Sequence, residues 1–328
     1  MFKMRSSWRR AWAALTKSQH PGKQKTLIEN TARLYLPDGT PASGADVRYD
    51  ELWQTYHGRT LAHPGHLPSG FCQQADFFSD RYREWMQALG EAPRLHRKQW
   101  EFYYICQALD ERAMLAPDRR GLGFGVGVEP LTALFAARGA EIVATDLELS
   151  DAQADGWVDT DQHASGLERL NQRGICPDDD FRRRVSFRAM NMNSIPTDFD
   201  GTFDFCWSAC SLEHIGSLQH GLDFIMRSVE TLKPGGIAVH TTEYNLSSND
   251  ETLDTPTLAL YRRRDIEALI DRVEAAGHSV SPIDWSSGSG FVDGYIDLPP
   301  YRDEPHLKLK ILDYDCTSIG LIIQRAAR

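Results

Sequence analysis

The sequence lacks a long apolar segment, since no run in its 328 residues approaches the ~20 residues that a membrane-spanning helix needs. Its N-terminus, "MFKMRSSWRRAWAALTKSQH", also lacks the apolar core and the small-residue cleavage site of a secretory signal. The chain is 41% apolar and 25% charged, which is typical of a globular protein. We therefore expect a cytoplasmic protein with a sizeable core.

Paired cysteine motifs are absent as well. The six cysteines form no CxxC, and the nearest two, Cys206 and Cys210 in "CWSAC", lie in an apolar stretch that indicates a buried strand. This pattern is typical of reduced thiols rather than of disulfides or a zinc site. "HPGH", with His63 and His66, stands near His57 but has no further ligands at metal spacing, so we expect surface histidines there.

Acidic residues are absent from the first 25 positions, which carry seven Lys and Arg, whereas the whole chain has a net charge of −10. The remaining body, at −17, is a poor match for nucleic acid, and we predict no nucleic-acid partner. The basic arm is open to three interpretations: a peripheral membrane or partner contact, a transit peptide, or a solvated terminus. Trp8, Trp12 and Leu15 would share one face of a short amphipathic helix there.

The chain divides into an N-terminal extension, residues 1–95, and a domain at 96–328. Residues 19–75 are rich in turn signals, with a hairpin indicated around 32–49. Helical periodicity marks 76–89 and 96–115, and apolar strand patterns then alternate with helices. Strands are predicted at 119–124, 140–148, 184–190, 203–209, 236–244, 279–285 and 317–326, and helices at 128–139, 218–232 and 263–278. Such alternation favours a parallel α/β sheet covered by helices on both faces.

The stretch "GLGFGVGVEP" places four glycines, Gly121, Gly123, Gly125 and Gly127, between a strand and a helix that has Pro130 in its first turn. Glycines at this junction let a ligand approach the backbone, and the helix N-terminus presents free N–H groups. Asp146 ends the next strand, where a carboxylate can accept both ribose hydroxyls. The alternative is a tight strand–helix turn that binds no ligand.

The motifs together resemble those of class I S-adenosylmethionine-dependent methyltransferases. The glycines follow the pattern GxGxG of this family rather than the GxGxxG of dinucleotide sites, and "ATDLE" resembles the family's acidic motif at the end of the second strand. "FDFCWSACSLEHIGSL" and "LKPGGIAVHTTE" resemble the motifs of the later strands. The resemblance covers roughly residues 96–285 and the final strand. The resemblance implies a Rossmann-like, seven-stranded, mostly parallel sheet whose last strand is antiparallel, and S-adenosylmethionine as cofactor. "RKQWEFYYI", "DLPPY" and "TSIGLII" further resemble an uncharacterised bacterial subgroup linked to surface-polysaccharide genes.

The resemblance implies a set of cofactor-binding residues with two departures from the family pattern. Gly121 stands where the family has an acid, so Glu129 or a group between Arg97 and Glu101 would orient the methionine half instead. Asn191 replaces the acid that accepts from the adenine amino group. The implied set is Gly121, Gly123, Gly125, Gly127, Asp146, Leu147, Asn191, Met192 and Ser208.

Methyl transfer to a hydroxyl needs a positioned base. We predict His214, His240 and Glu243 as candidates, with His306 as a further one, since the first three follow or end predicted strands. Alternatively, Glu213 and His214 cap a helix or line the cofactor pocket, and His240 is a core residue. No metal is predicted, although His240, Glu243 and His306 could converge on one.

Residues 286–316 form an insertion, with glycines for mobility and "LPP" for stiffness, which suits a substrate lid. Phe291, Tyr295 and Tyr301 could stack on a sugar there, and Trp157 could approach the adenosine; the alternative is packing against the N-terminal extension. We predict O-methylation of a small-molecule, sugar or glycan hydroxyl. The rival interpretations are a methyltransferase-like scaffold and an NAD or nucleotide-sugar oxidoreductase, and the oligomeric state stays open.

Overall fold

The computed structural model describes residues 48–56, 66–148, 164 and 166–327, and the backbone of two short strands, β1 (Leu34–Tyr35) and β2 (Pro41–Ala42). These two strands pair antiparallel, which confirms the predicted hairpin. The basic arm at 1–25, Trp157, His57 and His63 lie outside the described residues.

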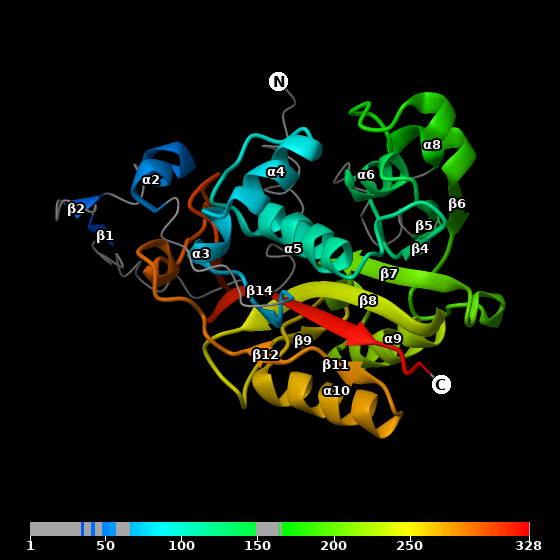
Figure 1. The fold of residues 1–328 in the computed structure, drawn as a ribbon. Coiled ribbons are helices and arrows are strands. Elements are labelled where there is room, and N and C mark those ends of the chain that lie inside the picture. The colour runs from blue at the N-terminus through cyan, green and yellow to red at the C-terminus, as the bar shows by residue number, and fades with distance from the viewer. Residues whose placement is uncertain are drawn as a thin grey trace.

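A mixed α/β sheet runs through the molecule (Figure 1). Its parallel part has the spatial order β6 (Val185–Ala189), β5 (Glu141–Asp146), β4 (Arg120–Gly123), β7 (Phe203–Ala209) and β8 (Leu232–Asn245). From β4 the chain adds β5 and β6 on one side, and later β7 and β8 on the other. In such Rossmann-like sheets ligands bind at the carboxyl ends of the strands where the order reverses, which here means between β4 and β7.

The other part of the sheet is built around β14 (Tyr314–Gln324), which pairs antiparallel with β8. β3 (Ser69–Phe71), β11 (Ser279–Val280) and β13 (Lys308–Ile311) also pair antiparallel with β14, and β12 (Ile283–Asp284) runs parallel to β3. The sheet therefore has ten strands rather than the predicted seven. The predicted strand at 279–285 splits into β11 and β12, because Pro282 between them has no N–H to donate.

Helices cover both faces of the sheet, and alternate residues of β7 show how the core divides. Phe205 and Trp207 join the core on the side of α5 and α6, whereas Cys206 between them joins the core beneath α9 and α10. The described α-helices after residue 79 are α4 (Asp80–Ala88), α5 (Arg97–Glu111), α6 (Leu131–Ala137), α8 (Asp178–Arg184), α9 (Leu218–Glu230) and α10 (Arg263–Ala275).

The N-terminal segment belongs to the same core as the sheet. Trp85 of α4 and Trp100 of α5 are both buried, so the core continues across the predicted boundary at residue 95. Tyr49 stacks on Phe78 with ring centroids 5.6 Å apart. The remaining elements are α2 (Tyr49–Tyr56), α3 (Gln74–Phe77), β9 (Asp254–Thr255), β10 (Leu258–Ala259), η2 (Leu167–Arg169), η3 (Thr197–Phe199), η4 (Leu212–His214) and η5 (Val292–Gly294).

The insertion at 286–316 packs against this N-terminal segment. The amide of Val292 donates to Gln74 Oε1 at 2.6 Å, and the amide of Gln74 donates to Asp293 Oδ1 at 2.8 Å. Farther along, the amide of His306 donates to the carbonyl of Leu95 at 2.7 Å. The alternative of packing against the extension is thus confirmed for these residues, while a lid function stays a prediction.

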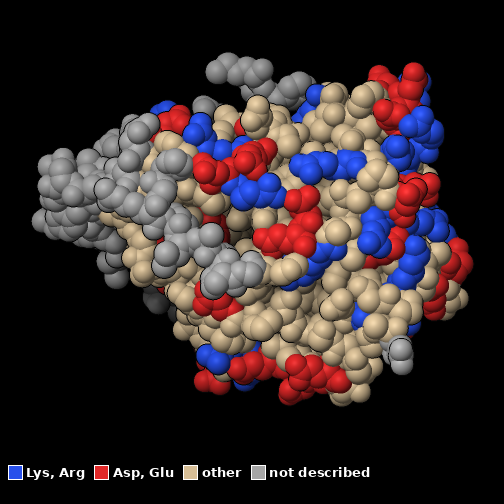
Figure 2. Space-filling view, viewed as in Figure 1, with Lys and Arg blue, Asp and Glu red and all other residues tan. Residues whose placement is uncertain are grey.

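The surface in Figure 2 carries acidic and basic side chains interspersed among neutral ones, with acidic groups gathered along the lower edge, over α10. No stripe of one sign crosses the described part of this face. Within the described ranges, every helix is too short or too polar to cross a lipid bilayer.

Candidate functional site

The loop after β4 is held in a conformation that favours glycine. Gly125 and Gly127 have φ of +54° and +52°, in the left-handed region where a Cβ is unfavourable. The amide of Phe124 donates to Trp207 O at 2.9 Å, and that of Val126 donates to Thr145 O at 3.0 Å. These bonds fix the loop between β5 and β7, at the carboxyl edge of the sheet.

Asp146 meets this loop from the end of β5. Its Oδ2 accepts from the amide of Gly127 at 3.2 Å and from that of Ala164 at 2.9 Å, and its Oδ1 accepts from the amide of Leu147 at 2.9 Å. Met192 lies against Gly125, with its Sδ 3.3 Å from the position of an added Cβ. The structure therefore brings five predicted cofactor residues together: Gly125, Gly127, Asp146, Leu147 and Met192.

Three other predicted cofactor residues have local explanations. A Cβ on Gly121 would collide with the ring of Phe205, and one on Gly123 with that of Trp207, so both glycines are required by packing within the sheet. Their assignment to close ligand approach stays a prediction. Asn191 is exposed, and its Oδ1 accepts from the amide of Asn193 at 2.9 Å.

His240 and Ser208 are core residues, which corrects both assignments. His240 is fully buried, with Nδ1 2.8 Å from Ser208 Oγ and Nε2 3.0 Å from Ser228 Oγ of α9. Its ring also meets that of Phe224 at an edge, 5.4 Å between centroids. Both ring nitrogens are thus engaged beneath α9, so this histidine cannot serve as the base.

We expect His240 to make the protein acid-labile. Burial lowers its pKa to about 3, below the ~6.5 of an unfolded histidine, so the folded state binds fewer protons. The stability that the neutral ring contributes to the folded state is fully present above pH 6.5 and is lost as the pH falls towards 3. Between pH 6.5 and 4 the free energy of unfolding should fall by about 3 kcal/mol for this reason. Urea unfolding across this range should show a shallower pH slope for His240→Gln than for wild type, and equal slopes would contradict the assignment.

A group of buried and partly buried polar side chains lies where α5 crosses the ends of β7 and β8. We call it the α5 cluster; it comprises Arg97, Lys98, Glu101, Glu129, Cys210, Glu213, Thr242, Glu243 and Ser318. Arg97 forms ion pairs with Glu243 and with Glu101, the latter at 3.2 Å. Lys98 Nζ lies 2.6 Å from Glu129 Oε1 and 3.2 Å from Glu101 Oε2. The cluster thus joins α5 to the glycine loop and to β8.

Cys210 and Glu213 enter the cluster from the segment after β7. Cys210 has φ of +47°, and its Sγ donates to Glu101 Oε1 at 2.9 Å. Glu213 Oε2 accepts from Thr242 Oγ1 at 3.0 Å. Among the residues that the structure describes, Glu213 Oε1 and Glu243 Oε2 are buried without a hydrogen-bond partner. Burial raises the pKa of Glu213 to about 7 and that of Glu243 to about 8.

Two expectations are corrected by these positions. Glu243 was predicted as a base at the end of a strand where it could meet the substrate, but it lies within β8 and is only 3% exposed. Cys210 was expected inside the strand, but it follows β7 and is partly exposed. Sequence reasoning assigned no role to Cys210; its position directly after an apolar strand is the only signal that could have drawn attention to it.

His214 lies in η4, half-buried at the same edge. Its Nδ1 is 2.7 Å from the carbonyl of Thr257, and because a carbonyl only accepts, Nδ1 carries the proton and Nε2 the lone pair. Burial lowers its pKa to about 4, so the ring is neutral near pH 7. His306 lies at the start of α5, where its carbonyl accepts from the amide of Arg97 at 3.0 Å, and its Nδ1 is 2.6 Å from Asp297 Oδ2.

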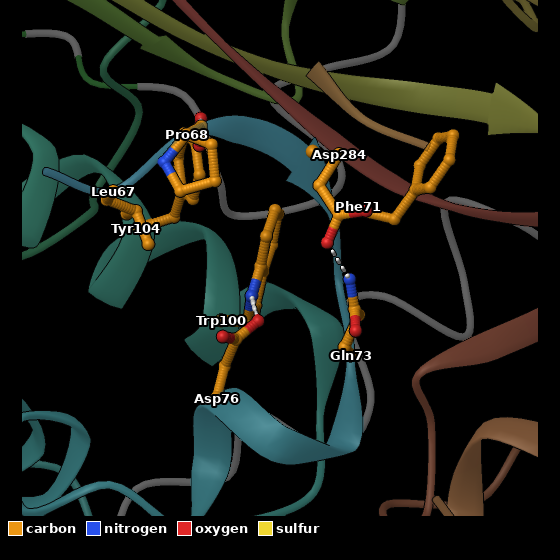
Figure 3. Close-up of a pocket in the computed structure, with 9 residues that line it drawn as sticks. Leu67, Pro68, Phe71, Gln73, Asp76, Trp100, Tyr104 and Asp284 are labelled. Carbon is orange, nitrogen blue, oxygen red and sulfur yellow. Dashed lines mark hydrogen bonds between the residues drawn. The ribbon is translucent and has the colours of Figure 1, made fainter. Parts of the chain in front are cut away.

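A small pocket beside β3 and α5 does not belong to this site (Figure 3). There the indole of Trp100 donates to Asp76 at 2.7 Å, and Gln73 donates to Asp284 at 3.2 Å. β3, which contributes to its wall, is separated from the glycine loop by β14, β8 and β7. The lining residues are Leu67, Pro68, Gly70, Phe71, Gln73, Asp76, Trp100, Tyr104 and Asp284.

No family model and no curated protein matches the chain. Several solved methyltransferase structures are similar to it at low identity. The CurJ carbon methyltransferase is 14% identical with a TM-score of 0.41, over 70% of this chain and 54% of that one. The magnesium protoporphyrin IX methyltransferase of Synechocystis, with bound S-adenosylhomocysteine, is 12% identical with a TM-score of 0.41, over 75% and 94%.

The 1,6-didemethyltoxoflavin-N1-methyltransferase of Burkholderia thailandensis is 14% identical with a TM-score of 0.41, over 67% of this chain and 76% of that one. TM-scores and identities this low do not assign a family to the chain. Its chemistry must be argued from its own residues.

Proposed function

We propose that the chain is an S-adenosylmethionine-dependent methyltransferase that acts on a small-molecule acceptor. The observation that carries the proposal is the hydrogen bond between the Gly127 amide and Asp146, because it joins the left-handed glycine loop to the acid at the end of the neighbouring strand. A bare loop beside a carboxylate, at the point where strand order reverses, suits a ligand with a ribose. The resemblance of the motifs to class I methyltransferases adds the identity of the cofactor.

The residues around the loop fit such a cofactor. Asp146 would accept from the ribose hydroxyls, and Met192 would pack on the adenine. Lys98 and Glu129 form an ion pair 2.6 Å long, which offers one positive and one negative group to the amino-acid half of the cofactor. Glu129 is one of the groups predicted to replace the family acid that is missing at Gly121. When bound, the cofactor supplies a methyl group already activated by its sulfonium.

The protein's own contribution to the reaction is positioning and proton removal. Holding the acceptor in line with the methyl group can lower the barrier by ~7–11 kcal/mol. Of the predicted bases, His214 has the suitable state, a neutral ring with its lone pair on Nε2. We propose a hydroxyl as acceptor, of a sugar, a glycan or a related small molecule, because it needs this base.

Binding of S-adenosylhomocysteine to Gly125→Val tests the cofactor site. At φ +54° a valine is strained, and its Cβ would lie 3.0 Å from Ser211. Displacement of the loop should weaken binding by about tenfold or more, corresponding to ~1.4 kcal/mol or more. Titration calorimetry of both proteins measures the difference.

Gly201→Val is the matched control, because Gly201 has φ of +64° and open space around it. It should lose stability and retain cofactor affinity. Equal affinity of wild type and Gly125→Val would remove the loop from the site, and preferential binding of NAD would favour an oxidoreductase. Binding of the cofactor without turnover on a panel of hydroxyl acceptors would favour a scaffold.

A further inference from the structure

The α5 cluster carries more buried negative charge than its cations balance. The four carboxylates of this cluster belong to Glu101, Glu129, Glu213 and Glu243, and its two cations are Arg97 and Lys98. If all these groups are ionised, two negative charges remain in a region withdrawn from water. An uncompensated buried charge is costly, so either protons or a cation must neutralise the excess.

In the described part of the chain, the carboxylates of Glu213 and Glu243 each have an oxygen without a hydrogen-bond partner and are therefore the candidates for binding a cation. Glu213 and Glu243 are 1% and 3% exposed, and each has one carboxylate oxygen with no hydrogen-bond partner among the described residues. These two side chains and the Sγ of Cys210 offer three ligand atoms that all lie within 4.8 Å of one another. The contacts with Arg97 and Thr242 use the other oxygen of each carboxylate.

We propose that Cys210, Glu213 and Glu243 form a binding site for a divalent transition-metal ion, with Zn²⁺ as the best fit to the ligand set. Zinc takes thiolate at ~2.3 Å and carboxylate at ~2.0–2.2 Å, which puts its ligand atoms roughly 3–4 Å apart. Closing the group onto an ion therefore needs shifts of about 1 Å. A thiolate ligand favours Zn²⁺ over Mg²⁺ or Ca²⁺, which prefer oxygen ligands alone.

Metal binding would also alter the cluster chemically. The thiol of Cys210 would release its proton to solvent as the thiolate–metal bond forms, and its present bond to Glu101 would be lost. Three protein ligands leave one tetrahedral position open for water or an anionic oxygen. The site lies at the ends of β7 and β8, but its existence does not depend on the proposed methyl transfer.

Titration of the full-length protein with Zn²⁺ tests the proposal. Protein treated with a chelator and then freed of it should bind one equivalent of Zn²⁺ in competition with a zinc-binding dye. Glu213→Gln and Glu243→Gln, which preserve side-chain shape, should each weaken binding by about tenfold or more. With Co²⁺ as probe, wild type should show a thiolate-to-cobalt charge-transfer band that Cys210→Ser lacks.

Cys176→Ser is the matched control, since this buried free thiol precedes α8. It should keep both the band and the affinity. Circular dichroism establishes that each variant is folded, and the two Gln variants carry the test if Cys210→Ser does not fold. Absence of stoichiometric Zn²⁺ binding to wild type, or unchanged affinity and band in the ligand variants, would overturn the proposal. Because no methyl donor is present, neither result depends on the proposed function.

Discussion

Arg97→Met is expected to unfold with a free energy about 3–5 kcal/mol below that of wild type. Arg97 is 2% exposed, and its guanidinium contacts Glu243, Glu101 and, at 3.1 Å, Ser318 Oγ. Removing it leaves both carboxylates buried with less compensating charge. Urea unfolding followed by circular dichroism, in the presence of a chelator, measures the loss.

The double variant Arg97→Met, Glu243→Gln should recover part of this stability, because it also removes one of the uncompensated charges. Arg183→Met is the matched control: Arg183 pairs with Asp180 on the surface of α8, where its side chain is 65% exposed, and its loss should cost less than about 1 kcal/mol. A loss at Arg97 no greater than at Arg183 would show that the cluster is hydrated in solution and its charges screened.

Local sequence patterns predicted the parallel part of the fold well. The apolar stretch at 203–209 is strand β7, and the glycine run with Asp146 lies at the switch point. Each of these signals lies within a few neighbouring residues, since a strand, a turn and a helix start follow from local composition. The short strands β3 and β13, which were not predicted, have only three and four residues, too few to form a pattern, and they depend on pairing with β14.

The site residues that were misassigned depend on long-range contacts. The polar residues of "VHTTEY" lie inside the sheet, because β14 pairs with β8 up to the register Cys316–Asn245. His240 and Glu243 consequently face opposite sides of the sheet, one towards Ser228 of α9 and the other towards Arg97 of α5. No spacing within the segment reveals which helix delivers a partner to either side chain.

His214→Phe is expected to lower kcat by about 10²–10⁴-fold while S-adenosylhomocysteine binds as to wild type. The neutral ring of His214 is held by its hydrogen bond to the carbonyl of Thr257 at 2.7 Å. It is the group predicted to take the proton from the hydroxyl that is methylated. A phenyl ring retains the bulk and removes the lone pair. Turnover is measured as methyl transfer to a hydroxyl acceptor found with the wild-type enzyme, and affinity by calorimetry.

His220→Phe is the control, because His220 is exposed at the start of α9, six residues along the chain. It should leave both kcat and affinity unchanged. If His214→Phe lowers affinity for S-adenosylhomocysteine as much as it lowers turnover, His214 lines the cofactor pocket rather than accepting the proton. If it changes neither, proton removal does not pass through His214. Since His240 is confined to the core, Glu243 of the α5 cluster and His306 would then be the remaining predicted bases.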